Sequence, residues 1–296
     1  MEVFVTQLVN GLSLASIFLL IALGLTITFG MMGIINFAHG EFLMLGAYTA
    51  HMLQKILPGM GGAAYFIAIP LAFVTAGLAG FITETILIRR LYGNPYGSIL
   101  ATWGLSMILQ EFARNVFGAS NVDVATPDIL KGGLPLLAGI RIPYTRMFIF
   151  SVSLAMLLSM AWVLYRSRIG RQIQAVMQIR PMAGCMGINT RRIDTFTFAF
   201  GSGLAGIAGT MVALLGSIGP STGQNYIVDS FLVVVLGGVG SLTGTLYGAL
   251  LMGFASPFLE YFTSASLGKV ILFGLIIVFL NRRPEGIALR NTRSLD

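Results

Sequence analysis

Three polar residues interrupt a long apolar region of the chain, within the stretch INFAHGEF at 35–42. Asn36, His39 and Glu41 carry side chains that can hold a proton, a cation or a polar solute. An ionisable group in a membrane segment costs at least a few kcal/mol unless it is paired or hydrated. Side chains two positions apart do not face each other on a regular helix. The stretch is therefore irregular, or its polar groups have different partners.

Several roles remain open for the polar cluster formed by Asn36, His39 and Glu41. It can be structural, with Asn36 as the N-cap of the following helix. It can contact a substrate directly, or it can act in a conformational switch. His39 and His51 are the two histidines and Cys185 is the single cysteine. The composition therefore predicts no metal site and excludes an intrachain disulfide.

A second polar set follows one face of the apolar segment 97–117. Thr102, Ser106 and Gln110 recur at helical spacing. A polar stripe in a membrane helix faces protein or water rather than lipid. These side chains can hydrogen-bond a small polar solute, or they can bond neighbouring helices.

The elements that position these residues are membrane helices. The chain of 296 residues is 56 % hydrophobic and only 10 % charged, against about 25 % charged residues in a soluble domain. Because a spanning helix needs roughly 20 apolar residues, the length allows about eight or nine crossings. We expect an all-α, polytopic membrane protein with one transmembrane domain, 1–296. The apolar segments lie at 5–30, 37–57, 63–88, 97–117, 146–166, 195–217, 229–262 and 266–281.

Arginine placement orients these segments. Arginines gather after 63–88, in the loop 167–194 and in the tail after 281, which predicts that all three regions are cytoplasmic. The loop 118–145 is then external and the N-terminus lies outside. The stretch 229–262 must cross twice or break, so we expect a short arm at 229–239, tilted or partly unwound, and a fuller helix at 243–262.

Glycines mark two broken crossings. Gly240, Gly244 and Gly248 recur every four residues, which puts them on one face of a helix and admits a close neighbour. These glycines either allow two helices to pack closely, or they form a face that slides or opens during transport. The broken segments at 30–46 and 229–248 lie in opposite halves of the chain, which suggests an inverted repeat.

The loop 167–194 predicts two short helices, one over 171–177 and one from Pro181 to near Gly187. It can lie on anionic lipid or dock a cytoplasmic protein. The net charge of +7 comes with arginines beside membrane segments, so a nucleic-acid partner is not expected. The GxxxxGK[ST] phosphate loop is absent, and a partner must supply the energy for any transport.

The stretch GLTITFGMMGIINFAHGEFLMLGAY at 24–48 and the stretch LGGVGSLTGTLYGA at 236–249 resemble the permeases of branched-chain amino-acid ABC importers. MGINTRRID, which ends the loop 167–194, and the tail RPEGI fit as well, so the resemblance covers nearly the whole chain. Other stretches resemble the urea-transporting branch, with short-chain amide importers also similar. These are ILATWGLSMILQ (99–110), FGASNVDVATP (117–127), IPYTRMFIF (142–150) and GQNYIVDSFLVVVLGGVGS (223–241).

The resemblance implies a subunit of the bacterial inner membrane that is not an enzyme. Its partners would be a second homologous permease, two cytoplasmic ATPases and a periplasmic substrate-binding protein. The partners would use ATP, and this chain would bind no cofactor. The loop 167–194 would dock an ATPase, although it lacks the acidic-Ala-Ala sequence of other importers. Its candidate coupling residues are Arg180, Pro181, Gly184 and Gly187.

Urea is small and neutral, so its pathway needs hydrogen-bonding groups rather than a counter-charge. Thr102, Ser106, Gln110 and Asn225 are of that type, and we expect them to line the pathway for urea or a short amide. The alternative in the same class is a branched-chain amino-acid permease. A stand-alone channel is less favoured, and a membrane enzyme least, because no catalytic set is present.

Overall fold

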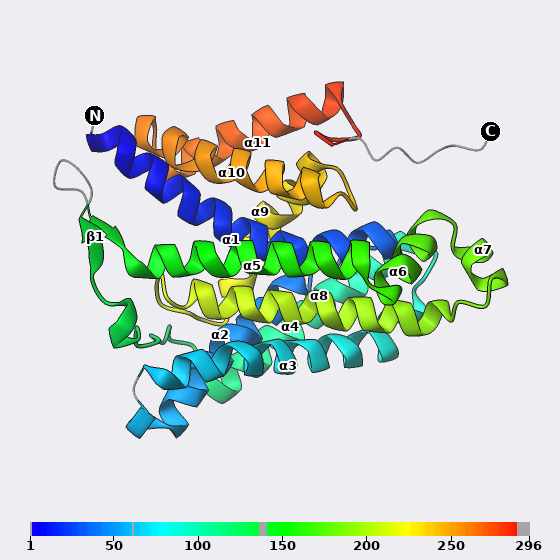
Figure 1. The fold of residues 1–296 in the computed structure, drawn as a ribbon, viewed down its shortest axis with the longest axis horizontal. Coiled ribbons are helices and arrows are strands. Elements are labelled where there is room, and N and C mark those ends of the chain that lie inside the picture. The colour runs from blue at the N-terminus through cyan, green and yellow to red at the C-terminus, as the bar shows by residue number, and fades with distance from the viewer. Residues whose placement is uncertain (1, 61, 136–140, 289–296) are drawn as a thin grey trace.

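Long helices running roughly along one axis form the protein (Figure 1). The computed structural model describes residues 2–60, 62–135 and 141–288. The long helices are α1 (Glu2–Met32), α2 (His39–Ile56), α3 (Ala63–Ile86), α4 (Pro95–Phe117), α5 (Tyr144–Arg166), α8 (Thr190–Val212), α9 (Thr222–Gly237), α10 (Leu242–Phe262) and α11 (Ala265–Arg282). Shorter elements are α6 (Arg168–Gln178), α7 (Arg180–Cys185), η1 (Pro58–Met60), η2 (Ile88–Arg90), η3 (Asp128–Leu130), β1 (Gly133–Pro135) and β2 (Arg141–Pro143).

Six helices within the described ranges are long and apolar enough to cross a membrane. They are α1, α3, α5, α8, α10 and α11. The other three long helices, α2, α4 and α9, are shorter or more polar. The expected all-α membrane fold is present. Length and composition thus support six of the eight or nine expected crossings. The remaining crossings stay a prediction.

The predicted short arm at 229–239 is wrong. The chain forms a regular helix, α9, from Thr222 to Gly237. Hydropathy missed its first turns because TGQN opens it, and polar residues there lower the apolar signal. Gly238 follows the helix as its C-cap, and its φ of 103° is a backbone conformation that glycine adopts without steric cost. Two full helices, α9 and α10, therefore occupy the region that the topology required to cross twice.

Two halves of the chain pack in the same way. Helix α1 packs on α10 as α8 packs on α3, and α2 lies on α3 as α9 lies on α10. Glycine pairs mark the place where the halves meet. A Cβ added to Gly24 or Gly201 would strike the backbone of the other, and the same holds for Gly40 and Gly223. This matched packing agrees with the inverted repeat that the broken crossings suggested.

The glycines 240, 244 and 248 do not share one helical face. Gly240 precedes α10, in a turn with φ of 78°, and its Cα lies 2.5 Å from the position of a Cβ added to Gly30 on α1. Gly244 and Gly248 lie on α10, where an added Cβ would strike the backbone of Gly237 and Val233 on α9. The four-residue spacing was therefore misleading for Gly240, because the helix begins after it.

The arginine-rich regions lie at one end of the molecule. Figure 1 shows α5 running from the hairpin β1–β2 at one end to α6 and α7 at the other. The predicted external loop packs at the hairpin end, where Gln54 of α2 exchanges hydrogen bonds of 2.7 and 2.8 Å with the Ala125 backbone. The start of α1 lies at that same end in Figure 1. The positive-inside rule then predicts that α6 and α7 are cytoplasmic.

Cys185 tests this topology without adding a thiol. It is exposed on α7 and is the single cysteine. A membrane-impermeant maleimide should label it in inverted membrane vesicles but not in intact spheroplasts. A Cys185→Ser, Asp128→Cys variant moves the thiol to the hairpin end and should give the opposite pattern. Labelling of Cys185 from outside would reverse the topology.

Gly244→Leu should destabilise the fold by about 1–3 kcal/mol, because overpacking forces helices apart. The leucine would strike the Gly237 backbone, so we expect less folded protein by size-exclusion chromatography and a lower melting temperature. Gly104→Leu is the matched control, since an added Cβ there meets no atom within 4 Å. If the two variants gave the same yield of folded protein and the same melting temperature, the α9–α10 contact would not be tight.

Candidate functional site

The polar cluster at the start of α2 ties three helices together. His39 Nε2 lies 3.2 Å from the Ile21 carbonyl oxygen of α1. Glu41 Oε1 accepts hydrogen bonds of 2.9 Å from Ser106 Oγ and from Gln110 Nε2 on α4. His39 therefore bonds α1, whereas Glu41 bonds α4. Different partners for the polar groups were one of the two arrangements that their spacing allowed.

Asn36 is not the N-cap of α2. Residue Ala38 takes that position, without a side-chain cap. Asn36 Oδ1 instead accepts a hydrogen bond of 3.0 Å from the Ala38 amide, which closes a local turn ahead of the helix. The N-cap lies two residues after Asn36, so Asn36 shapes the broken crossing rather than capping the helix.

The polar stripe of α4 faces α2. Ser106 and Gln110 bond Glu41, and they bond each other at 3.0 Å. Thr102 Oγ1 accepts from the Phe37 amide at 3.3 Å and donates to the Ile99 carbonyl at 3.1 Å. All three α4 side chains are buried. Their polar groups form hydrogen bonds between α4 and the start of α2, which was the alternative to contact with a solute. A role in the substrate pathway stays a prediction.

Asn225 lies apart from that stripe, in a cavity of about 490 Å³ between α1, α8, α9, α10 and α11. Asp229, Glu260 and Lys269 also line the cavity, and Lys269 Nζ lies 3.7 Å from Asp229 Oδ2. Apolar side chains complete the wall, among them Leu14 and Phe18 of α1. The site therefore combines an apolar surface with charges of both signs.

A second cavity of about 400 Å³ adjoins the first, because both are lined by Leu14, Leu215 and Glu260. Its wall includes Arg146 of α5, which contacts the Asn10 side chain of α1. Sequence reasoning missed the charged lining of both cavities. The signal was present, since charged residues inside membrane segments face protein or water and often mark a pathway.

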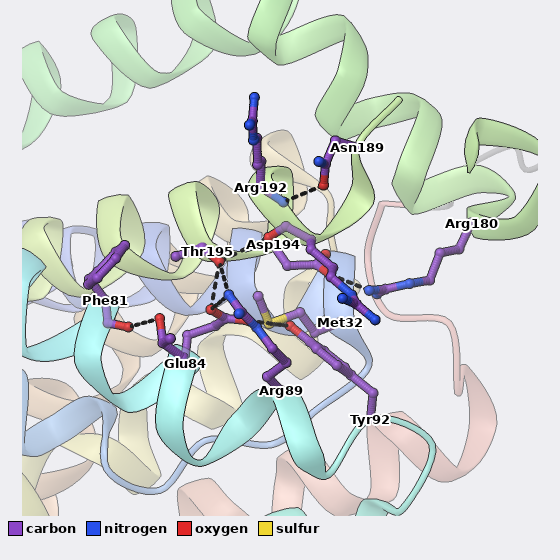
Figure 2. A network of polar contacts seen from close by, with 12 residues as sticks. Met32, Phe81, Glu84, Arg89, Tyr92, Arg180, Asn189, Arg192, Asp194 and Thr195 are labelled. Atoms are coloured by element: carbon purple, nitrogen blue, oxygen red, sulfur yellow. Dashed lines mark hydrogen bonds and ion pairs between the residues drawn. The ribbon is translucent and has the colours of Figure 1, made fainter. Parts of the chain in front are cut away.

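A separate polar network joins α3, α7 and α8 at the arginine-rich end (Figure 2). Glu84 of α3 is fully buried and pairs with Arg89 at 3.1 Å. Its Oε2 also accepts from Thr195 Oγ1 of α8 at 2.6 Å. Asp194, the neighbour of Thr195, is likewise fully buried and forms an ion pair with Arg180 of α7.

Tyr92 connects the two carboxylates of this network. Its hydroxyl donates to Glu84 Oε1 at 3.4 Å, and its ring lies 4.6 Å from the guanidinium carbon of Arg180. Burial, together with the charges of Asp194 and Glu84, raises the pKa of the Tyr92 phenol. The phenol therefore stays protonated at physiological pH and remains a donor.

The four candidate coupling residues separate into two groups. Arg180 points into the network, whereas Pro181, Gly184 and Gly187 are exposed. Met182 and Met186 are exposed beside them. The two short helices predicted in the loop 167–194 are present as α6 and α7, and α7 has an inward polar anchor and an outward apolar surface.

Residues 7–280 match the protein family described as "Branched-chain amino acid transport system / permease component". The chain is 33 % identical to the high-affinity branched-chain amino acid transport system permease protein BraD of Pseudomonas aeruginosa, over 96 % of this chain and 95 % of BraD. LivH of Escherichia coli, the permease protein of a system with the same description, is 31 % identical over the same shares.

The ribose import permease protein RbsC of Haemophilus influenzae is 29 % identical, over 93 % of this chain and 83 % of its own length. These relatives are permeases and not enzymes. No solved structure matches the chain.

Glu41→Gln should keep the contact between α2 and α4, because an amide oxygen can accept from Ser106 and Gln110 as the carboxylate does. Glu41→Ala should lower the free energy of unfolding by about 1–3 kcal/mol, since it leaves buried donors unsatisfied. Thermal melting of the purified protein measures both effects. A neutral Glu41→Gln variant that assembles but transports nothing, at any pH from about 6 to 8, would show that the charge itself is needed.

Proposed function

The chain belongs to the permease family of branched-chain amino acid transport systems, and we propose that it is a membrane subunit of an ATP-driven importer for branched-chain amino acids. A second homologous permease, two cytoplasmic ATPases and an external binding protein would complete the importer. This replaces urea as the leading substrate. The amino-acid proposal is supported by the names of the relatives and by the cavity around Asn225.

The observation that carries the proposal is the pairing of opposite charges with an apolar wall. A free amino acid carries an ammonium and a carboxylate, so a site for it needs an acceptor and a cationic donor. Asp229 and Glu260 supply the first, and Lys269 supplies the second. Leu14 and Phe18 offer apolar surface to an aliphatic side chain. A neutral solute such as urea needs neither charge.

The cavities also indicate where the second permease would sit. Charged and amide side chains on α1, α9, α10 and α11 would be costly to expose to lipid. We therefore place the second permease against this face, where it would close the cavities into a pathway. The outer faces of α3 and α4 expose many large apolar side chains and suit lipid.

The proposed topology has nine crossings in the bacterial inner membrane, made by α1 to α5 and α8 to α11. An odd number of crossings puts the N-terminus and the tail on opposite sides of the membrane, and the arginine distribution makes the tail the inner one. The exposed surface of α7, with Pro181, Met182 and Met186, would dock an ATPase. ATP would bind to that partner rather than to this chain.

Urea or a short-chain amide is the second candidate. Four stretches of the sequence support it, chief among them ILATWGLSMILQ at 99–110 and GQNYIVDSFLVVVLGGVGS at 223–241. Against it, Ser106 and Gln110 are occupied by Glu41. A stand-alone channel remains the alternative from a different class.

Uptake by the complete importer in liposomes distinguishes these candidates. We expect saturable, ATP-dependent uptake of leucine and no uptake of urea or acetamide. Liposomes that contain this chain alone should show no flux. Urea or acetamide uptake without leucine uptake would replace the substrate, and flux without the partners would favour the channel.

The cavity is tested by the double variant Asp229→Asn, Lys269→Gln, which removes both charges and keeps the pair neutral. The leucine concentration that gives half-maximal uptake should rise about tenfold, which corresponds to the loss of one charged hydrogen bond. The control Glu111→Gln, Arg114→Gln removes an exposed pair on α4 and should change nothing. Equal half-saturation in the two variants would remove the cavity from the pathway.

A further inference from the structure

Arg180 is the charged side chain that joins α7 to the buried ends of the membrane helices. It is the first residue of α7, and it pairs with Asp194 of α8. Its guanidinium lies over the ring of Tyr92, which follows α3. Pro181, Met182 and Gly184 of α7 are exposed, whereas Ala183 packs against the core. Arg180 therefore supplies the ionic link from α7 to α8 and the end of α3, beside the apolar contact of Ala183.

The charges of the network balance only when Arg180 is in place. Asp194 and Glu84 are both fully buried, whereas the side chains of Arg180 and Arg89 remain 36 % and 37 % exposed. Arg89 neutralises Glu84 and also donates to Thr195 at 2.9 Å. Asp194 has Arg180 as its ion-pair partner. Removing one member of a buried ion pair is strongly unfavourable, because the charge that remains is uncompensated.

Withdrawal of Arg180 would therefore force a change at the start of α8. Asp194 would have to take up a proton, reach water or move toward Arg89. Thr195 beside it is hydrogen-bonded to Glu84 at 2.6 Å. Helix α8 packs on α1, α2 and α3, so a shift of its first turn acts on both halves of the fold. Tyr92 adds a second link, since its hydroxyl lies 3.7 Å from Met32 Sδ at the end of α1.

We propose that Arg180, Asp194 and Tyr92 form a latch that transmits movement of a docked ATPase from α7 to α8, α3 and α1. The latch rests on the proposed function as an importer subunit. The three residues act by positioning helices and do not touch the substrate. In the latched state the two arginines hold the cytoplasmic ends of α3 and α8 together, and release of Arg180 frees α8.

Variants of the complete importer that remove or swap the charges of Arg180 and Asp194 test the latch. Arg180→Gln and Asp194→Asn should each lower the transport driven per ATP hydrolysed by about fivefold or more, the lower range of allosteric coupling. Co-purification of the ATPases should stay unchanged, because the outward surface of α7 is intact. The swapped variant Arg180→Asp, Asp194→Arg should regain a clear part of the lost coupling.

Two further variants refine the test. Tyr92→Phe keeps the ring beneath Arg180 and should retain more coupling than Tyr92→Ala. The swap Glu111→Arg, Arg114→Glu exchanges an exposed pair on α4 and should leave coupling at the wild-type level. If Asp194→Asn fails to assemble, the Arg180→Gln variant decides, since the Arg180 side chain is partly exposed.

The outcomes separate the latch from the proposed function. Wild-type coupling in Arg180→Gln would overturn the latch while leaving the importer in place. Loss of ATPase co-purification in that variant would also overturn it, because Arg180 would then be a docking residue. A wild-type complex without any ATP-dependent uptake would instead overturn the importer proposal itself.

Discussion

Backbone contact between the two halves of the chain is the constraint on which the rest of the structure depends. In a membrane, helices gain little from the hydrophobic effect against lipid, so close van der Waals packing holds them together. Gly24 on α1 meets Gly201 on α8, and Gly40 on α2 meets Gly223 on α9. A side chain at any of these positions would strike the opposite backbone. These contacts fix α1 and α8 at the centre, and the other helices pack around them.

Polar groups are distributed around this centre according to what they can pair with. His39 and Glu41 bond groups of α1 and α4, so the start of α2 is fixed on both sides. Glu84 and Asp194 pair with arginines at the end of the helices. The cavity around Asn225 is different, because its charged groups line open space and pair more loosely. That difference separates a structural polar cluster from a site that can admit a solute.

The two ends of the molecule have different physical character. At the hairpin end, short elements close the chain over α2 through backbone bonds such as those of Gln54. At the other end, α6 and α7 project from the helices, with an exposed outer surface and a buried ionic anchor. An exposed surface suits a partner that binds, and a buried anchor suits the transfer of movement into the membrane.

The sequence by itself determined the fold class, the arginine-rich end and the positions of most membrane helices, because apolar length and charge bias are local properties. It also indicated α6 and α7 and the polar character of Asn36, His39 and Glu41. Only the tertiary structure decided that Ser106 and Gln110 bond Glu41, that α9 is a regular helix, and that Gly240 precedes α10. It alone brought together Asp229, Glu260 and Lys269, and also Arg180 with Asp194. Those contacts join residues on different helices, and one sequence carries no record of which faces meet.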